Sequence, residues 1–213
     1  MANAHAPRKR MVVGISGASG AVYGVRLLRL LRTLDIESHL VMSRSAMVTL
    51  AYETDLKPAD VQALADHHYS NNDIGAAISS GSFRTAGMIV APCSVKSLSE
   101  IATGVTSGLL TRAADVVLKE RRRLVLMLRE TPLHLGHIRS MAAATEAGAI
   151  VYPPVPAFYA KPVTLEDMVD HTLGRVLDLF DIDAKTVHRW RDPAEQQAGT
   201  PPSEEQVKEW TNN

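Results

Sequence analysis

The chain lacks the features that would tie it to an oxidising compartment or to a membrane. It has a single cysteine, Cys93, so an internal disulfide is excluded and a reducing compartment is favoured. No apolar run approaches the roughly 20 residues that a membrane-spanning helix needs. Residues 1–10 are short and basic, and the apolar segment of a secretory signal does not follow them. We therefore expect a cytoplasmic protein with no membrane partner.

An excess of charge of one sign is also missing. Lys+Arg and Asp+Glu are both 23, so the formal net charge is zero and no nucleic-acid partner is indicated. Aromatic residues make up only 5%, but 46% of the residues are hydrophobic, and 213 residues suit one domain with a full core. We expect a single α/β domain over 11–190, between a disordered tail at 1–10 and a polar tail at 191–213.

Short apolar runs alternate with helical patterns along the chain, which predicts an α/β fold built on a buried parallel sheet. The predicted strands are 11–15, 39–42, 87–91, 124–128 and 149–152, the third of them ended by Pro92. The predicted helices are 21–34, 97–101, 109–121, 138–147 and 165–180. The segment 58–83 begins with a helical pattern and then becomes rich in Asn, Asp, Ser and Gly, without a clear assignment.

The loops that follow the predicted strands share a polar character. Ligands bind at the carboxyl ends of the strands in an open parallel sheet, so these loops are the expected binding edge. Four of the five are small, hydroxyl-bearing or charged. The loops are 16–20, 43–45, 92–97, 129–132 and 153–159.

The first of these loops is a glycine-rich turn between a strand and a helix. Its glycines let backbone approach a ligand, and the free N–H groups at the helix start favour an anion or an electron-rich ring edge. The spacing 14, 17, 20 and 24 is not the dinucleotide fingerprint, and Ser43 stands where an acid would bind the ribose. The pattern disfavours NAD and favours a mononucleotide or flavin, with a tight turn that binds nothing as the alternative.

Three other candidates have simple structural explanations. Ser94 either contacts a ligand or only caps a helix. Cys93 has no histidine beside it in sequence, and a lone cysteine at a strand end is more often a small buried hydrophobe than a nucleophile. His134 and His137 have the spacing of a metal pair but no third ligand nearby, so we predict no metal.

The window 112–129 is the richest in charge. Its cations are Arg112, Lys119, Arg121, Arg122, Arg123 and Arg129, against only Asp115 and Glu120. We expect the three consecutive arginines to be mostly solvated at a helix end. Arg112 and Lys119 are seven apart and share a helix face. Arg129 follows a buried strand and should point into the cleft, and Glu130 beside it is either an acid–base group or part of a structural ion pair.

Taken together, several motifs resemble those of the UbiX-type flavin prenyltransferases. They are Gly14-Ile15-Ser16-Gly17-Ala18-Ser19-Gly20, Tyr52-Glu53-Thr54-Asp55, Pro92-Cys93-Ser94, the stretch from Arg112 to Arg122, Arg129-Glu130-Thr131-Pro132-Leu133-His134-Leu135-Gly136-His137 and Pro153-Pro154-Val155-Pro156-Ala157-Phe158-Tyr159. The likeness extends from about residue 11 to residue 190. One departure is Ser107, where members of that family often have Asp or Asn.

The resemblance implies a flavodoxin-like or Rossmann-like three-layer sandwich with a central parallel sheet, assembled as a homododecamer. It implies that a dimethylallyl group passes from dimethylallyl phosphate to reduced FMN, with bonds at N5 and C6. The product, prenylated FMN, is the cofactor of UbiD-type decarboxylases. Such chemistry also needs an apolar shelter, which we expect from the loop 153–158 and Trp190.

The resemblance also assigns roles by position. The residues expected to contact FMN are Gly17, Ala18, Ser19, Ser43, Ser94, Val95, Lys96, Ser97 and Arg129. Those expected to contact the prenyl phosphate are Tyr159, Arg175, Lys119 and Arg112. The expected catalytic residues are Glu130, which with Ser19 protonates the departing phosphate, and Glu53, which assists proton transfer at the flavin.

Arg175 lies roughly 200° around its predicted helix from Leu173, away from the apolar stripe. We therefore expect it to serve the site of a neighbouring subunit.

Two alternatives stay open. One is a flavin-dependent decarboxylase of the peptidyl-cysteine or pantothenoyl-cysteine type, which shares the fold but carries an Asn-rich motif not found here. The other is a non-catalytic FMN-binding partner of a second protein.

Overall fold

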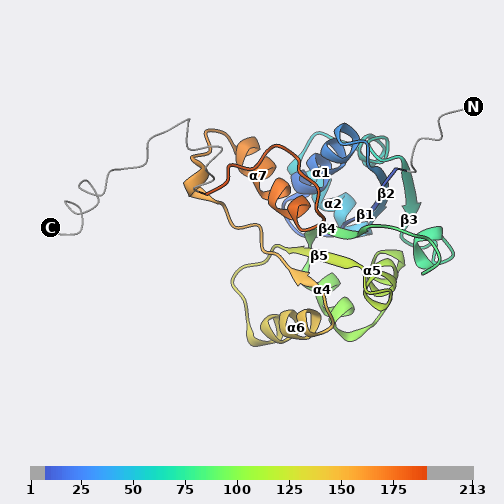
Figure 1. The fold of residues 1–213 in the computed structure, drawn as a ribbon. Helices are drawn as coiled ribbons and strands as arrows, with labels where there is room; N and C mark the ends of the chain where they lie inside the picture. The colour runs from blue at the N-terminus through green and yellow to red at the C-terminus, as the bar shows by residue number, and fades with distance from the viewer. Residues whose placement is uncertain (1–7, 191–213) are drawn as a thin grey trace, which may run out of the picture.

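The computed structural model describes residues 8–190, which form an α/β sandwich around one parallel sheet (Figure 1). The sheet has six strands in the order β3-β2-β1-β4-β5-β6, and every neighbouring pair is parallel. Its strands are β1 (Arg10–Ile15), β2 (Glu37–Met42), β3 (His67–Ser70), β4 (Gly87–Cys93), β5 (Arg123–Leu128) and β6 (Ile150–Val151).

Helices cover both faces of the sheet, which confirms the predicted three-layer architecture. On one face lie α1 (Ala21–Thr33), α2 (Arg44–Glu53), α3 (Pro58–Gln62) and α7 (Leu165–Asp178). On the other lie α4 (Val95–Thr103), α5 (Leu109–Lys119), α6 (Leu135–Glu146) and the short 3-10 helix η1 (Ala77–Ser79). Within the described chain, no helix is long and apolar enough to cross a membrane.

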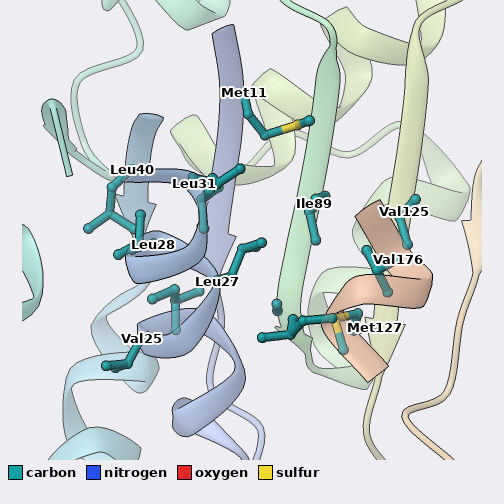
Figure 2. Packing of buried hydrophobic residues seen from close by; sticks show 14 of the residues in the cluster. Met11, Val25, Leu27, Leu28, Leu31, Leu40, Ile89, Val125, Met127 and Val176 are labelled. Atoms are coloured by element: carbon teal, nitrogen blue, oxygen red, sulfur yellow. The ribbon is translucent and has the colours of Figure 1, made fainter. Parts of the chain in front are cut away.

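The strands are apolar on both faces because each face supports its own core. In β1, Met11 and Ile15 pack under α1 and α7, whereas Val12 belongs to the cluster under α4 and α5. Figure 2 shows the first cluster, in which Leu27 of α1 and Val176 of α7 lie on the same side of the sheet as the labelled strand residues. All five of these side chains are at most 1% exposed, as expected for a sheet buried on both faces.

The structure departs from the sequence prediction at four places. Helix α2 and strand β3 had not been assigned, and β3 lies within the unassigned segment 58–83. Strand β4 does not stop before Pro92 but continues to Cys93 through an irregularity in its register with β5. The domain also starts before residue 11, because Arg10 opens β1 and Arg8 pairs with Asp66 at 2.9 Å. Residues 1–7 and the predicted tail at 191–213 lie outside the described residues.

The carboxyl edge of the sheet collects the starts of α1, α2, α4 and α5. The strand order reverses between β1 and β4, since β2 lies on one side of β1 and β4 on the other. In open α/β sheets, ligands bind in the crevice at this switch point. The loops that follow β1, β2 and β4 are therefore the expected ligand-binding loops.

Candidate functional site

The loops after β1 and β4 are joined across the switch point by one serine. Ser16 donates from its hydroxyl to the Pro92 carbonyl at 2.9 Å and accepts from the Ser94 backbone N–H at 2.7 Å. Gly17 is required because a Cβ there would lie 2.2 Å from the Cβ of Ser45. The glycine-rich turn thus lets three loops approach closely, as its composition suggested.

Glu53, at the end of α2, reaches across to the start of α1. Its carboxylate accepts from the backbone N–H groups of Gly20 at 2.9 Å and Ala21 at 2.9 Å, and from the Ser19 hydroxyl. Partial burial acts to raise the pKa of Glu53, but the bonds from Ser19, Ala21 and Gly20 and the Arg129 charge outweigh it and lower the pKa below its ordinary value. Glu53 is therefore ionised at neutral pH. Ser19, which we expected to act with Glu130, is thus in contact with Glu53.

Arg129 stands at the other side of this group. Its backbone N–H donates to the Cys93 carbonyl at 3.1 Å, and its charge acts on both Glu53 and Tyr23. Burial raises the pKa of the Tyr23 phenol, with the Arg129 charge opposing that rise. The side chain of Glu130 is exposed, and its carboxylate accepts from the Thr131 backbone N–H at 3.0 Å.

The serines that follow β2 and β4 both cap helices. Ser43 accepts from Ala46 N–H at 3.1 Å at the start of α2, and Ser94 accepts from Ser97 N–H at 3.3 Å at the start of α4. Ser94 also donates to the Ser97 hydroxyl at 3.2 Å. The structural explanation for Ser94 is thus correct. Because each hydroxyl both donates and accepts, the Ser43 and Ser97 protons stay available to a ligand.

These elements line a polar cleft at the switch point that is partly open to solvent. It includes five of the residues predicted for FMN, whereas Ala18, Ser19, Val95 and Arg129 are not in its lining. The cleft is lined by Gly17, Ser43, Ser45, Asn71, Ser94, Lys96, Ser97, Glu100, Ser107, Gly108, Leu110 and Thr111.

Asn71, which sequence reasoning missed, holds the start of α5. Its backbone carbonyl accepts from Leu109 N–H at 2.8 Å, and its side-chain oxygen accepts from Leu110 N–H at 3.0 Å. Gly108, the N-cap residue of α5, has no side chain to do this. The Asn-rich stretch after β3 was the only sequence signal for this role.

Glu100 closes the far side of the cleft and was also missed. It accepts from the Ser107 hydroxyl at 2.7 Å and pairs with Lys96 at 3.6 Å. Ser107, the position that departs from the resembled family, is thus held by a carboxylate. Lys96 itself is 78% exposed, so it can turn toward a ligand.

Tyr159 and Arg175 form a second group on the α7 side. The Tyr159 ring makes edge contacts with His171 at 5.7 Å and with Trp190 at 5.4 Å between ring centroids. Arg175 follows His171 by one helical turn and pairs with Asp178 at 2.7 Å. Burial raises the pKa of the Tyr152 phenol, and the Arg175 charge opposes that rise.

The helix position of Arg175 agrees with our expectation. The residue is exposed and turned away from the apolar stripe of α7, as the helix periodicity indicated. That it serves the site of a neighbouring subunit stays a prediction.

Arg112 and Lys119 share one face of α5, as their spacing predicted, and this is the outer face of the helix. Neither residue lies with the other site residues. Arg112 pairs with Asp115 at 2.6 Å, and Lys119 pairs with Glu120. Lys119 is eight residues beyond the cleft residue Thr111, about 12 Å along the helix axis. It therefore lies at the amino end of the sheet, opposite the cleft.

Two of the three consecutive arginines are exposed, in agreement with the expectation that they are mostly solvated, and the third is partly buried. Arg122 donates to the backbone carbonyls of Phe83 and Gly81, both at 2.7 Å, so it ties the loop before β4 to the start of β5. Arg121 and Arg123 are exposed. Their position at the amino end of β5 separates all three from the cleft.

The remaining candidates have structural roles. Cys93 is fully buried, and burial raises the pKa of its thiol to about 12, so it stays protonated and inert. His134 accepts from Gly136 N–H at 3.0 Å and caps α6.

Glu37, His39 and His67 place three ligand atoms within 4.8 Å of one another. Arg10 already pairs with this carboxylate at 3.2 Å, and the group lies at the amino half of β2, away from the cleft.

Comparisons with known proteins agree with this geometry. A family model described as Flavoprotein matches residues 2–190, which places the chain among the flavoproteins. A flavin prenyltransferase UbiX of Escherichia coli strain K12 is 62% identical over 175 residues, covering 82% of this chain and 93% of the relative. The chain therefore belongs to the family of UbiX flavin prenyltransferases.

Solved structures of similar proteins share this fold closely. AnUbiX (PadA1), solved with FMN and dimethylallyl pyrophosphate, is 53% identical with a TM-score of 0.86, over 87% of this chain and 99% of that one. A dodecameric FMN-dependent UbiX-like decarboxylase from Escherichia coli O157:H7 is 49% identical with a TM-score of 0.83, over 86% and 100% of the two chains. The peptidyl-cysteine decarboxylase EpiD is only 16% identical with a TM-score of 0.60, so it shares the fold alone.

Proposed function

We propose that this chain is a flavin prenyltransferase, which joins the dimethylallyl group of dimethylallyl phosphate to N5 and C6 of reduced FMN. The identity of 62% to a UbiX flavin prenyltransferase, over 93% of that relative, is the observation that carries the proposal. In the reaction the bond to N5 forms as the allylic carbon–oxygen bond breaks, and the N5 proton leaves with inorganic phosphate. The bond to C6 forms as the carbon–carbon double bond of the prenyl group opens, with one proton taken up by the prenyl chain and the C6 proton released.

FMN occupies the cleft at the switch point in this proposal. The donors that line it, among them Ser43 and Ser97, suit the ribityl chain and phosphate, with α4 and α5 beginning at its wall. The start of α1 is not free for a phosphate, because Glu53 already fills it. Arg129, Ala18 and Ser19 would then border the isoalloxazine ring, with Val95 beneath it.

Glu130 is the proposed general acid, acting with Ser19 on the departing phosphate. It is supported by its place beside Arg129 and by its exposed carboxyl, which holds no ion pair among residues 8–190. Glu53 is proposed to assist proton transfer at the flavin. Its carboxylate shares the Ser19 hydroxyl, so a proton can pass between the two.

The prenyl phosphate is proposed to bind beside Tyr159 and Arg175. Arg112 and Lys119 can add charge to such a site only from a neighbouring subunit, since they lie on the outer face of α5 away from it. We therefore propose a closed homo-oligomer, a dodecamer as in the similar Escherichia coli O157:H7 protein.

A large set of exposed apolar side chains supports this assembly, because soluble monomers seldom expose so many. These residues are Leu133, Leu135, Ile138, Val155, Phe158, Val163, Leu165 and Trp190. Part of this surface is the loop that we expect to shelter the reacting group.

The product is proposed to serve a UbiD-type decarboxylase, in the cytoplasm. Both statements stay predictions. Activation of an apo-decarboxylase of that type by the reaction mixture, and not by FMN alone, is the measurement that checks the first.

The proposed reaction is tested by phosphate release. FMN-loaded protein is incubated anaerobically with dimethylallyl phosphate, with and without a flavin reductant. We expect phosphate to appear only when the flavin is reduced. Release that does not depend on the reduced flavin, as from a phosphatase, contradicts the proposal.

A further inference from the structure

The cleft at the switch point contains one acid that the proposed reaction leaves without a role. Among the described residues that line this cleft, Glu100 is the only acidic one. The lining otherwise offers groups that favour an anion, such as the Lys96 ammonium and the hydroxyls of Ser43 and Ser97. A cleft built only to hold the anionic phosphate of a flavin would exclude a carboxylate, because like charges repel. The presence of Glu100 therefore needs an explanation.

The Glu100 carboxylate is held at the cleft by two other lining residues. Its Oε2 accepts from the Ser107 hydroxyl at 2.7 Å, and its Oε1 lies 3.6 Å from Lys96 Nζ. The side chain of Glu100 is 15% exposed, whereas that of Lys96, one turn earlier on α4, is 78% exposed. Lys96 can therefore turn to a ligand, while the carboxylate stays at the wall.

A phosphate in this cleft competes with Glu100 for Lys96. If Lys96 turns to the phosphate, it gives up its ion pair, and the hydroxyl of Ser107 remains with the carboxylate. The negative charge of Glu100 then also opposes the phosphate directly, and its small exposure limits screening by solvent. Both effects weaken the binding of a flavin that carries a phosphate.

Weak binding of the phosphate is useful when the flavin is substrate and product rather than a permanent cofactor. Product release limits the turnover of many enzymes. An interaction that is equally strong in the ground state and the transition state does not speed the chemical step. Lower affinity for the flavin phosphate would therefore leave the chemistry unchanged and let the product leave.

We propose that Glu100 sets the affinity for the flavin phosphate, keeping it low enough for the prenylated flavin to be released. The inference rests on the proposed function and adds to it a residue outside those assigned to either substrate. The competing explanation is that the Glu100 carboxylate accepts a hydrogen bond from a ribityl hydroxyl. That explanation predicts weaker binding, not tighter, when the charge is removed.

The test replaces Glu100 by Gln, which keeps the size of the side chain and an oxygen that can accept from Ser107. The Kd for FMN should fall roughly tenfold, and the Kd for riboflavin, which has no phosphate, should not change. The difference between variant and wild type should narrow as ionic strength rises. Fluorescence titration of the flavin-free protein measures these constants. Glu146→Gln, an exposed carboxylate outside the cleft lining, is the matched control and should bind both flavins like the wild type.

Stopped-flow dissociation of FMN tests the link to release. The Glu100→Gln variant should release FMN more slowly, with a melting temperature close to the wild-type value. An unchanged Kd for FMN overturns the inference, and so does an equal change in the Kd of riboflavin, because the phosphate would then not be involved. Tighter binding with an unchanged dissociation rate overturns the role in release.

These measurements separate this inference from the proposed function, because none of them needs turnover. Tighter FMN binding and slower release in a protein that never prenylates the flavin support the effect of Glu100 and contradict the function. Normal prenylation by a Glu100→Gln variant with an unchanged Kd for FMN contradicts the inference and leaves the function intact.

Discussion

At the residue scale, Glu53 occupies the backbone N–H groups at the start of α1 that a bound anion would otherwise use. The sequence suggested that the start of α1, after the glycine-rich turn, would receive an anion from a ligand. The protein's own carboxylate receives those N–H groups instead, at 2.9 Å from both Gly20 and Ala21. No sequence pattern links Glu53 to Gly20, because the contact joins the end of α2 to the start of α1 across 33 residues.

Glu53→Gln should lower the free energy of unfolding at pH 7 by about 1 kcal/mol, the usual worth of a helix cap. Because the folded-state pKa of Glu53 is lowered, its stabilisation is present above the unfolded-state pKa and is lost as pH falls through the folded-state value. Urea unfolding between pH 7 and pH 3 should show the two proteins converging. Glu146→Gln, in the last turn of α6, is the control. A difference that persists at low pH would show that charge is not the cause.

Glu130→Gln should leave FMN bound but slow prenyl transfer by roughly 10²-fold or more, the usual contribution of a general acid. Single-turnover kinetics under saturating substrate measure the chemical step directly. Glu146→Gln should react at the wild-type rate. If Glu130→Gln does so too, this carboxyl has no part in proton transfer.

Single residues were predicted unevenly, and the reason is physical. Ser43, Ser94 and Arg129 follow strands, so the rule for parallel sheets places them at the binding edge. The partners of Arg122 could not be predicted, since its carbonyl acceptors lie 39 and 41 residues away in sequence.

At the element scale, the start of α5 depends on a residue from another strand. Gly108 cannot cap the helix, and Asn71 after β3 supplies both acceptors. A Cβ on Gly108 would lie 2.5 Å from the Asn71 amide nitrogen, so the two positions are mutually adapted. The position of α5 in the wall of the cleft therefore depends on this contact.

Asn71→Ala should destabilise the fold by about 1–2 kcal/mol, the range for a lost cap, and should weaken FMN binding because α5 lines the cleft. Denaturant midpoints and a flavin fluorescence titration measure the two effects. Asn72→Ala removes the neighbouring exposed side chain and should change neither quantity. Equal effects of the two substitutions would show that the capping contact is unimportant.

The elements that sequence reasoning missed have weak patterns. Strand β3 reads His67-His68-Tyr69-Ser70 and lies at the edge of the sheet, so it lacks the apolar run of a central strand. Helix α2 buries only Ala46 and Leu50, which leaves little periodicity to detect. The predictions of β1, β2, β4 and β5 succeeded because strands buried on both faces are nearly continuous apolar runs.

At the scale of the whole molecule, the site residues do not all meet within one chain. Lys119 lies at the amino end of the sheet, and Glu130 at its carboxyl end. A strand of six residues separates these ends by about 20 Å. If both act on one phosphate, they come from different subunits.

Mixed oligomers of Lys119→Ala and Glu130→Gln chains should therefore recover activity. With equal, random mixing, roughly a quarter of the sites contain both wild-type residues. Arg175→Ala chains mixed with Glu130→Gln chains should also recover some activity, because we expect Arg175 to serve the site of a neighbouring subunit. No recovery in a mixture after verified subunit exchange would show that one chain supplies both of its residues.

The central claim is that the protein modifies FMN itself, and the mass of the flavin tests it most directly. The protein is incubated anaerobically with reduced FMN and dimethylallyl phosphate, in the presence of a chelator, because Arg and Lys rather than a metal are expected to neutralise the phosphate. The flavin is then released by denaturation and weighed by mass spectrometry. We expect the released flavin to have the mass of FMN plus one five-carbon prenyl unit. Recovery of unmodified FMN from protein that binds both substrates, or modification only after Mg²⁺ is added, would contradict it.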